Sequence, residues 1–332
     1  MRKKNKKLME QVNEVLAKRG QKAFEIARDL MLREKIQYKP LNDALRYFLD
    51  ESWYDVQHPA LISLTCEAVG GNPEETTQIG AAIVLLTGAA DIHDDIIDES
   101  KVKNSKFTVY GKFGRDIALL VGDALIFEGL TFLLLWCQRL PKRKRNTILK
   151  LIKQAFFEIG EAEAYETDLR GKYDIEAKKY LNLIKRKAAI AEATARVGAI
   201  IGDGTTEEIR IWGHYGRILG ILMTIRDEFA DMIEHEELRS RIENECLPLP
   251  ILYVLKNKNV KKKVLPLLKK SISEENANRV AQEIMETEEI IFLKRKMENL
   301  IHDIIRKLKF NQNSATLKKI MHKLLYAAIE DL

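Results

Sequence analysis

Residues 89–100 read AADIHDDIIDES, a stretch in which acidic side chains stand among apolar ones. On an α-helix, residues three, four and seven positions apart share one face, so Asp91, Asp94 or Asp95, and Asp98 point to the same side. Carboxylates at this spacing repel one another, and more strongly when they are withdrawn from water. The stretch therefore predicts a helix with a cation beside it. Mg²⁺ is a suitable one, because it binds one or two carboxylates and leaves places for water and phosphate.

A second acidic cluster, RDEFAD at residues 226–231, repeats the pattern of two acids, two spacers and a third acid with Asp227, Glu228 and Asp231. One such cluster alone is more often a solvated helix face with salt bridges. Two copies within apolar helical stretches favour a different interpretation, in which two facing helices build one metal site.

The rest of the chain predicts an all-α fold. Its 332 residues are 46% hydrophobic, with only 7 Pro and 17 Gly, and apolar residues recur at three- and four-residue spacing, as in the stretch from 10 to 32. Short breaks near Pro40 and at 70–75, 170–174, 202–204, 245–250 and 273–278 separate ten or more helices, which is typical of a helical bundle. No long linker divides them, so one domain spanning residues 1–332 is expected. The segments NPEETTQIG and GTTEEI are predicted helix starts.

Composition argues against several other classes of protein. The net charge of +6 resides largely in basic runs without interleaved aromatic residues, so nucleic-acid binding is not expected. The three cysteines are far apart and suggest neither a disulfide framework nor a zinc site. The most apolar run, residues 117–137, contains Asp123 and Glu128 and is predicted to be a buried helix, so no transmembrane segment is expected. No targeting signal is recognisable, and a cytoplasmic location is the default expectation.

The motifs resemble those of the trans-isoprenyl diphosphate synthases, or polyprenyl synthetases. DIHDDIID and RDEFAD resemble the two aspartate-rich motifs of that family. Other segments follow in family order from about residue 40 to 255: EAVGG at 67–71, FTVYGKFGRDIALLVGDALI at 107–126, IKRKAAIAEATARVGAIIG at 184–202, and LPLPILYVL at 247–255. Residues 256–332 would add C-terminal helices. The resemblance implies an isoprenoid-synthase-like helical bundle around a deep central cavity.

The resemblance also implies roles for individual residues. Mg²⁺ would be held by both acidic helices and would bind an allylic prenyl diphosphate, whose ionised chain is attacked by isopentenyl diphosphate. The implied catalytic residues are Asp94, Asp95, Asp98, Lys187, Asp227 and Asp231, and the implied metal ligands are Asp94, Asp95, Asp98, Asp227, Glu228 and Asp231. Lys187 and Lys103 would contact substrate diphosphate, although Lys187 could equally be an ordinary exposed lysine.

Other positions depart from the family pattern, and most of them belong to the half of the site that would bind isopentenyl diphosphate. Asp55, Val56 and His58 stand where basic residues are usual, and Thr87 stands where a histidine is usual. The arginine pair after the first motif is Lys103 and Asn104, and the later Gly-Lys is Glu243 and Asn244. A diphosphate needs several cations to leave water. Other basic residues would have to bind the acceptor, the candidates being Lys103, Lys106, Lys112 and Arg115.

Three hypotheses follow. The first is a Mg²⁺-dependent prenyltransferase of geranyltranstransferase type that lengthens an allylic diphosphate with isopentenyl diphosphate in isoprenoid biosynthesis. The second is a catalytically degenerate or length-setting subunit of a hetero-oligomeric prenyl synthase. The third is an ionising enzyme related to terpene cyclases. The family resemblance implies a homodimer.

Several further residues have weaker interpretations. Small side chains at Ala89 and Ala90, one turn before Asp94, predict an open cavity floor and a product longer than three isoprene units, unless Leu86 or Phe127 closes it. His58 and His93 are expected to be packed or exposed rather than catalytic, and the core is expected to include Trp212, Tyr215 and Met223.

Overall fold

The helical periodicity of the sequence is confirmed in a computed structural model, which describes residues 2–103, 105–269, 273–310, 315–330 and 332. Within these residues the only strands are β1 and β2, two residues each, which form a small antiparallel hairpin. The elements are α1 (Arg2–Leu32), α2 (Lys39–Tyr47), the π-helix η1 (Phe48–Ser52), α3 (Gln57–Ala68), the 3₁₀-helix η2 (Pro73–Thr76), α4 (Thr77–Ile97), β1 (Val102–Lys103), β2 (Lys106–Phe107), α5 (Val109–Phe113), α6 (Arg115–Cys137), α7 (Lys142–Thr167), α8 (Ala177–Lys187), α9 (Ala189–Ile201), α10 (Thr206–Ile233), α11 (His235–Asn244), α12 (Leu249–Val254), α13 (Lys258–Leu268), α14 (Glu274–Met285), α15 (Glu288–Lys307) and α16 (Ala315–Ala327).

The predicted helix starts carry the expected capping contacts. Thr205 and Glu208 form a reciprocal capping box at the start of α10. The Asn72 side chain accepts a hydrogen bond from the backbone of Glu74. Such caps satisfy backbone N–H groups that have no partner inside the helix. They explain why α10, one of the two acidic helices, begins where the sequence predicts.

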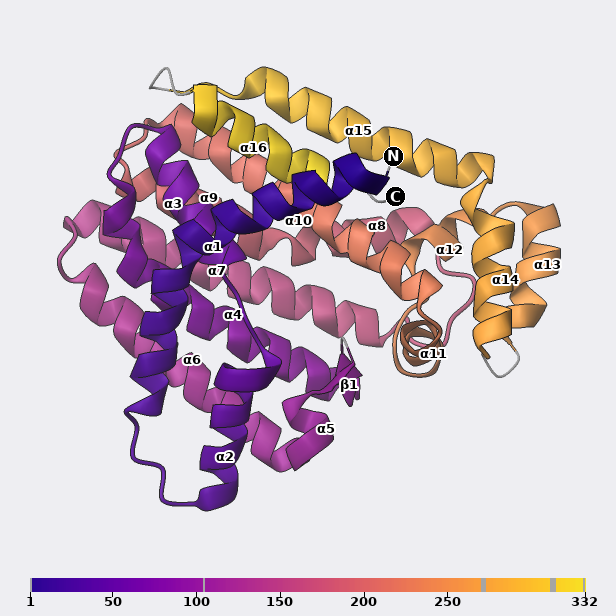
Figure 1. Cartoon of the computed structure of the whole chain (residues 1–332), viewed down its shortest axis with the longest axis horizontal. Coiled ribbons are helices and arrows are strands. Elements are labelled where there is room, and N and C mark those ends of the chain that lie inside the picture. Colours follow the sequence, from indigo (N-terminus) through magenta and orange to yellow (C-terminus); the bar gives the residue numbers. More distant parts are fainter. Residues whose placement is uncertain (1, 104, 270–272, 311–314, 331) are drawn as a thin grey trace.

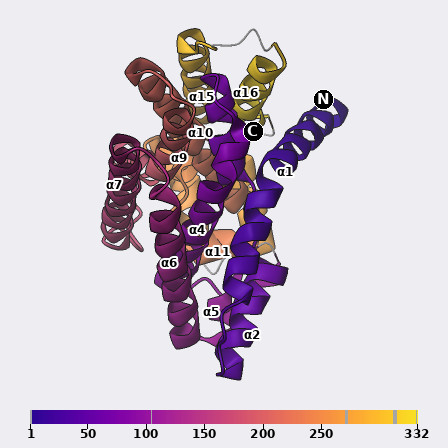
Figure 2. The same cartoon turned by 90° about the vertical axis from the view of Figure 1, so that its left-hand side faces the viewer.

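The two acidic helices belong to different layers of the bundle. α4 packs lengthwise against α6, and α10 packs against α9, which in turn contacts α3 and α7 (Figures 1 and 2). The first and last helices, α1 and α16, lie side by side, and the two ends of the chain lie close to each other (Figure 1). The hairpin β1–β2 follows the end of α4 and places Lys103 beside the first acidic cluster.

The largest core cluster surrounds α10. Trp212 and Tyr215 are fully buried, and their rings meet edge to face with centroids 5.5 Å apart. The Tyr215 hydroxyl donates a hydrogen bond of 2.8 Å to the carbonyl of Met321, which attaches α16 to α10. The prediction that Trp212 and Tyr215 are core residues is therefore confirmed, whereas Met223 is partly buried and lines a cavity.

The structure corrects the prediction that the apolar helix α6 is buried. It is buried along one face only, through residues such as Ala118, Val121 and Leu125. The opposite face exposes large apolar side chains, and Phe127 retains 77% of its accessible surface. In the described part of the chain, α6 alone is long and apolar enough to cross a membrane, with a mean hydropathy of 2.0. One such helix is weak support for a membrane span, because core helices of soluble proteins meet the same criterion.

Candidate functional site

The first acidic cluster lies at the C-terminal end of α4. Asp95 is buried, and its Oδ1 atom lies 2.6 Å from Nζ of Lys103, which is also 3.5 Å from Oδ2 of Asp94. Burial raises the pKa of Asp95 to about 6, even though Lys103 opposes this shift. A cation expected beside these acids is therefore present as the ammonium group of Lys103.

Asp98 ends α4 and is paired differently. Its Oδ1 accepts a hydrogen bond of 2.8 Å from Nη2 of Arg170, and the same nitrogen donates to the carbonyl of Ile97. Burial, with the negative charges of Asp94 and Glu245 added, raises the pKa of Asp98 to about 8. A carboxyl group that resists ionisation this strongly is one that a further cation would stabilise in its charged form.

The second acidic cluster has two members that are open to solvent. Asp227 is exposed and Asp231 is half-buried on the same side of α10. Although both residues keep contact with solvent, surrounding protein atoms desolvate their carboxyl groups in part, which raises the pKa of Asp227 to about 6 and that of Asp231 to about 7. For Asp231 the guanidinium of Arg241 acts in the opposite direction, with Nε 3.9 Å from Oδ2.

Glu228 points the other way, into the core. Its Oε1 accepts a hydrogen bond of 2.6 Å from Nη2 of Arg241, and its Oε2 accepts one of 2.6 Å from the backbone N–H of Leu249. The Tyr180 hydroxyl lies 2.8 Å from Oε1 as well. Burial raises the pKa of Glu228 despite the charge of Arg241. Both carboxylate oxygens are thus committed to protein groups, so the prediction that Glu228 binds metal has no support from these contacts and stays untested.

Lys187, the last residue of α8, pairs with two acids outside both clusters. Its Nζ lies 2.9 Å from Oε2 of Glu163 and forms an ion pair with Glu166, both on α7. Burial lowers the pKa of Lys187, but Glu166, Glu163 and Asp94 outweigh it and hold the net pKa well above the usual range. The alternative that Lys187 is an ordinary exposed lysine is therefore wrong, because its ammonium group is paired with Glu163 and Glu166.

A cavity of about 260 Å³ opens beside this network. Lys187 and Asp227 both line it, together with Arg226 on α10 and His58 on α3. Its apolar wall comes from α1, α9, α10 and α16, with Met9, Leu16, Ile190, Leu219, Met223 and Leu324 among the lining residues. The cavity therefore combines charged groups of the predicted site with an apolar surface.

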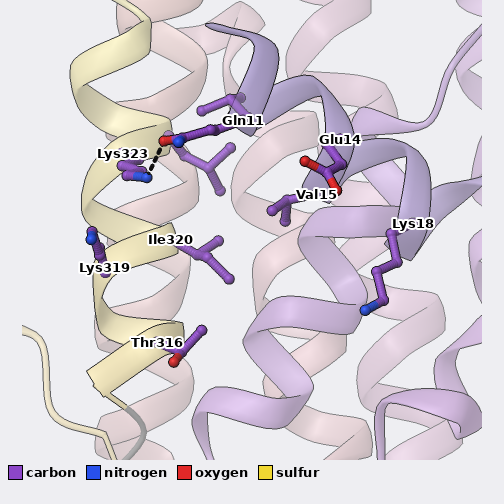
Figure 3. A pocket seen from close by; sticks show the side chains of 10 residues that line it. Gln11, Glu14, Val15, Lys18, Thr316, Lys319, Ile320 and Lys323 are labelled. Atoms are coloured by element: carbon purple, nitrogen blue, oxygen red, sulfur yellow. Dashed lines mark hydrogen bonds between the residues drawn. The ribbon is translucent and has the colours of Figure 1, made fainter. Parts of the chain in front are cut away.

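A second hollow of about 310 Å³ lies between α1 and α16 and shares Val12 and Leu324 with this cavity. Figure 3 shows Val15 and Ile320 on its inner side, while Lys323 donates a hydrogen bond to Gln11 across the gap. It contains none of the predicted site residues.

The structure brings three of the positions that depart from the family pattern into one hydrogen-bonded group. Asp55 is buried, and its Oδ2 accepts hydrogen bonds from Thr87 Oγ1 at 3.0 Å and from His58 Nδ1 at 2.8 Å. Its Oδ1 accepts from the backbone N–H groups of Gln57 and His58. The charged Asp55 carboxylate is thus fully hydrogen-bonded within the protein, and these bonds help to lower its pKa.

Of the other basic candidates for the acceptor, Lys106 and Lys112 are engaged elsewhere, whereas Arg115 is exposed at the start of α6. Nζ of Lys106 donates a hydrogen bond of 2.7 Å to the Glu51 carbonyl, and Nζ of Lys112 lies 3.5 Å from the centre of the Tyr47 ring. Asn104 lies outside the described residues. His93 packs against Gly122, where an added Cβ would come within 2.6 Å of the ring nitrogen Nε2.

Several residues of the network were not identified from the sequence. They are Glu163 and Glu166 on α7, Arg170 shortly after α7, Tyr180 on α8, Arg241 on α11, and Glu245 just after α11. The α7 pair carried a usable signal, because residues 163 and 166 are three positions apart and share a helix face. Arg241 carried none, since its partner Glu228 lies on a different helix.

The acidic side chains of the two clusters are chemically suited to bind a hard divalent cation. They offer carboxylate oxygens, the ligands that Mg²⁺ takes together with water and phosphate. Among the described residues, no three His, Cys, Asp or Glu side chains are already gathered in a position to hold an ion. Lys103 and Arg170 instead pair with the α4 acids, so these ion pairs would have to rearrange when a cation and a phosphate enter.

Comparison with known proteins identifies the family. A family model described as "Polyprenyl synthetase" matches residues 42–287. The chain belongs to the polyprenyl synthetase family. The family assignment made from the aspartate-rich motifs is thereby confirmed.

Individual relatives in this family share about a third of their residues or fewer with the chain. The chain is 30% identical over 187 residues to the short chain isoprenyl diphosphate synthase of Methanothermobacter thermautotrophicus, a match that covers 54% of each chain. It is 28% identical over 180 residues to the geranylgeranyl diphosphate synthase of Sulfolobus acidocaldarius, again over 54% of each. These matches span about half the length of the relatives.

Among solved structures, the geranylgeranyl pyrophosphate synthetase of Pyrococcus horikoshii superposes with a TM-score of 0.82 at 22% identity, over 96% of this chain and 99% of that one. At this identity the likeness establishes the fold alone, and it confirms the all-α isoprenoid-synthase bundle.

Proposed function

We propose that this chain is a Mg²⁺-dependent prenyltransferase that joins an allylic prenyl diphosphate to isopentenyl diphosphate and releases a longer trans-prenyl diphosphate. The observation that carries the proposal is that Lys187, whose pKa the charge of Asp94 on α4 helps to raise, lines a largely apolar cavity together with Asp227 of α10. The curated relatives named above carry prenyl diphosphate synthase names, which supports the same activity.

The metal ligands we propose are Asp94, Asp95, Asp98, Asp227 and Asp231. Burial and neighbouring negative charges raise the pKa values of Asp95, Asp98, Asp227 and Asp231, and a bound cation would offset both effects. When bound, Mg²⁺ would neutralise the diphosphate as it leaves the allylic carbon. Glu228 is left out of this set because both its oxygens are bonded to Arg241, Tyr180 and Leu249.

Lys187 and Lys103 would hold diphosphate oxygens. Lys103 is paired with Asp94 and Asp95, and binding of a cation by these acids would release its ammonium group toward phosphate. Lys187 is paired instead with Glu163 and Glu166, so a diphosphate would compete with these two carboxylates for its ammonium group. The apolar side chains of α9, α10 and α16 would exclude water from the allylic cation while it is attacked.

The exposed face of α6 supports a homodimer. Large apolar side chains form one stripe along this helix: Leu119, Leu120, Phe127, Leu130, Leu134 and Leu135. A continuous apolar stripe on a soluble chain marks an interaction surface. A second copy of the chain would cover it, and the single-domain organisation and cytoplasmic location expected from the sequence stay predictions alongside it.

A three-arm assay tests the proposal against its alternatives. The chain is incubated with Mg²⁺ and an allylic diphosphate alone, with added isopentenyl diphosphate, and with isopentenyl diphosphate plus a synthase whose acceptor motifs are intact. We expect a longer prenyl diphosphate in the second arm. Hydrocarbon or alcohol in the first arm would instead support a terpene-cyclase-like enzyme, and product in the third arm alone would support a partner subunit.

A further inference from the structure

Arg170 lies in the turn that follows α7, and the proposed reaction leaves this cation of the acidic site without a role. The turn is attached to the segment after α11, because the backbone N–H of Gly171 donates a hydrogen bond of 3.4 Å to the carbonyl of Glu245. The Arg170 side chain is attached to the end of α4, because its Nη2 donates to the carbonyl of Ile97 and to Oδ1 of Asp98, both at 2.8 Å. The turn therefore holds a guanidinium group against the first acidic cluster.

The guanidinium of Arg170 has more hydrogen-bond donors than these two contacts use. A guanidinium carries five N–H groups in a fixed planar fork. In the part of the chain that the structure describes, Nη2 has the two partners named above, whereas Nε is buried without a partner. A buried donor without a partner costs free energy. The side chain also keeps 30% of its surface accessible, so an anion that enters the site can reach donors that no described protein group uses.

The sequence lacks a cation that a diphosphate site would need. The first acidic motif is followed by Lys103 and Asn104, where the family pattern has two arginines. Lys103 and Lys187 alone supply two positive charges, and a diphosphate needs several cations to leave water. A guanidinium also binds two phosphate oxygens at once, which the single ammonium group of a lysine does not do in a fixed geometry. Arg170 offers such a group from a different element of the fold.

We propose that Arg170 binds the diphosphate group of the allylic substrate. The inference rests on the proposed function, in which Asp98 is one of the metal ligands. In the structure, Asp98 and Arg170 neutralise each other. A carboxylate that binds a metal ion shares its negative charge with that ion, so the guanidinium beside it is left with a positive charge to be neutralised. Arg170 then exchanges its carboxylate partner for the phosphate oxygens that bind at the same acidic cluster.

The test measures binding of inorganic pyrophosphate in Mg²⁺ by calorimetry. Arg170→Met removes both the charge and the planar fork, whereas Arg170→Lys keeps the charge alone. We expect the Kd for pyrophosphate to rise about tenfold or more in Arg170→Met, because a charge-assisted hydrogen bond is lost, and to rise less in Arg170→Lys. Circular dichroism shows whether each variant is folded, and the lysine variant decides the matter if the methionine variant is not.

Arg196→Met is the matched control. Arg196 on α9 resembles Arg170 in its surroundings: its side chain is 35% exposed, its Nη1 lies 3.2 Å from the carboxylate of Glu192, and its Nε is also buried without a partner among the described residues. Its carboxylate partner belongs to neither acidic cluster. The control should therefore bind pyrophosphate as the wild type does.

A Mg²⁺ titration of pyrophosphate binding separates direct contact with the diphosphate from an indirect effect through Asp98. If Arg170 only held Asp98 in place for the metal, Arg170→Met would need more Mg²⁺ and would regain wild-type affinity once Mg²⁺ is saturating. We expect instead that the weaker binding persists at saturating Mg²⁺. The concentration of Mg²⁺ that is needed should not rise, because the variant has lost a cation that competes for Asp98.

Wild-type affinity for pyrophosphate in both Arg170 variants would overturn the inference, and so would full recovery of Arg170→Met at saturating Mg²⁺. In the turnover assay, the KM for the allylic diphosphate should rise while the KM for isopentenyl diphosphate stays close to that of the wild type. A rise in the KM for isopentenyl diphosphate alone would also overturn the inference, because Arg170 would then bind the acceptor. Failure of the proposed function has a different signature: the wild-type chain makes no prenyl diphosphate, whatever its affinity for pyrophosphate.

Discussion

Replacement of Arg241 by methionine should be among the most destabilising single changes in this protein. The guanidinium is buried and donates hydrogen bonds to Glu228 Oε1 at 2.6 Å, to the Tyr180 hydroxyl at 2.7 Å and to Glu245 Oε2 at 2.8 Å. Methionine fills a similar volume but leaves two buried carboxylates without their cation. Loss of one partner from a buried ion pair costs about 3–5 kcal/mol, a large part of the total stability of a typical domain.

Urea denaturation followed by circular dichroism at neutral pH measures this loss. The matched control is Arg210→Met, which removes an exposed arginine paired with Glu207 on α10 and should change the free energy of unfolding far less than Arg241→Met does. In the double variant with Glu228→Gln, the charge on residue 228 is also gone, so the added cost of Arg241→Met should shrink. A loss below about 1 kcal/mol in Arg241→Met, equal to that of the control, would refute the role given to this buried network.

The remaining predictions concern the metal site, the product, the dimer and pH. Asp227→Asn should abolish Mg²⁺-dependent product formation, whereas folded Glu228→Gln should need no more Mg²⁺ than the wild type, and a Mg²⁺ titration of activity distinguishes them. Ala90→Phe should shorten the prenyl chain of the product, as measured by chromatography. An unchanged chain length would exclude the prediction that Ala89 and Ala90 form the floor of the substrate cavity. Phe127→Asp should convert a dimer to a monomer in analytical ultracentrifugation, because it places a charge in an apolar interface. The raised pKa of Asp98 means that the folded, metal-free chain binds more protons than the unfolded chain between its ordinary value near 3.8 and about 8. Stability in EDTA should therefore fall as pH rises through this interval, and Asp98→Asn should flatten the slope measured by urea denaturation at several pH values.

The fold was predictable because its determinants are local. Three- and four-residue apolar spacing marks the helices, and caps such as Thr205 and Asn72 mark their starts. The exposed face of α6 was missed, because an apolar run predicts burial equally well against the same chain and against a second one. The structure distinguishes these two possibilities, because α4 packs against only one side of α6.

The site was predictable only in part, because a spacing pattern does not show which way a side chain points. Asp227 and Glu228 are adjacent acids, and on a helix adjacent side chains point about 100° apart. The two carboxylates therefore do not point into the same metal site. The direction of Glu228 depends on Arg241, thirteen positions further on, and on the backbone of Leu249. Likewise, the Asp55 carboxylate is held in part by a hydrogen bond from Thr87, which lies on another helix.

The central claim is that the chain by itself transfers an allylic group to isopentenyl diphosphate. The most direct measurement is incorporation of radiolabelled isopentenyl diphosphate into longer prenyl diphosphates by the purified chain, with allylic substrates of several lengths, in Mg²⁺ and in EDTA. The account predicts a labelled, longer prenyl diphosphate in Mg²⁺ and none in EDTA. No labelled product at saturating concentrations of both substrates in Mg²⁺ would contradict it.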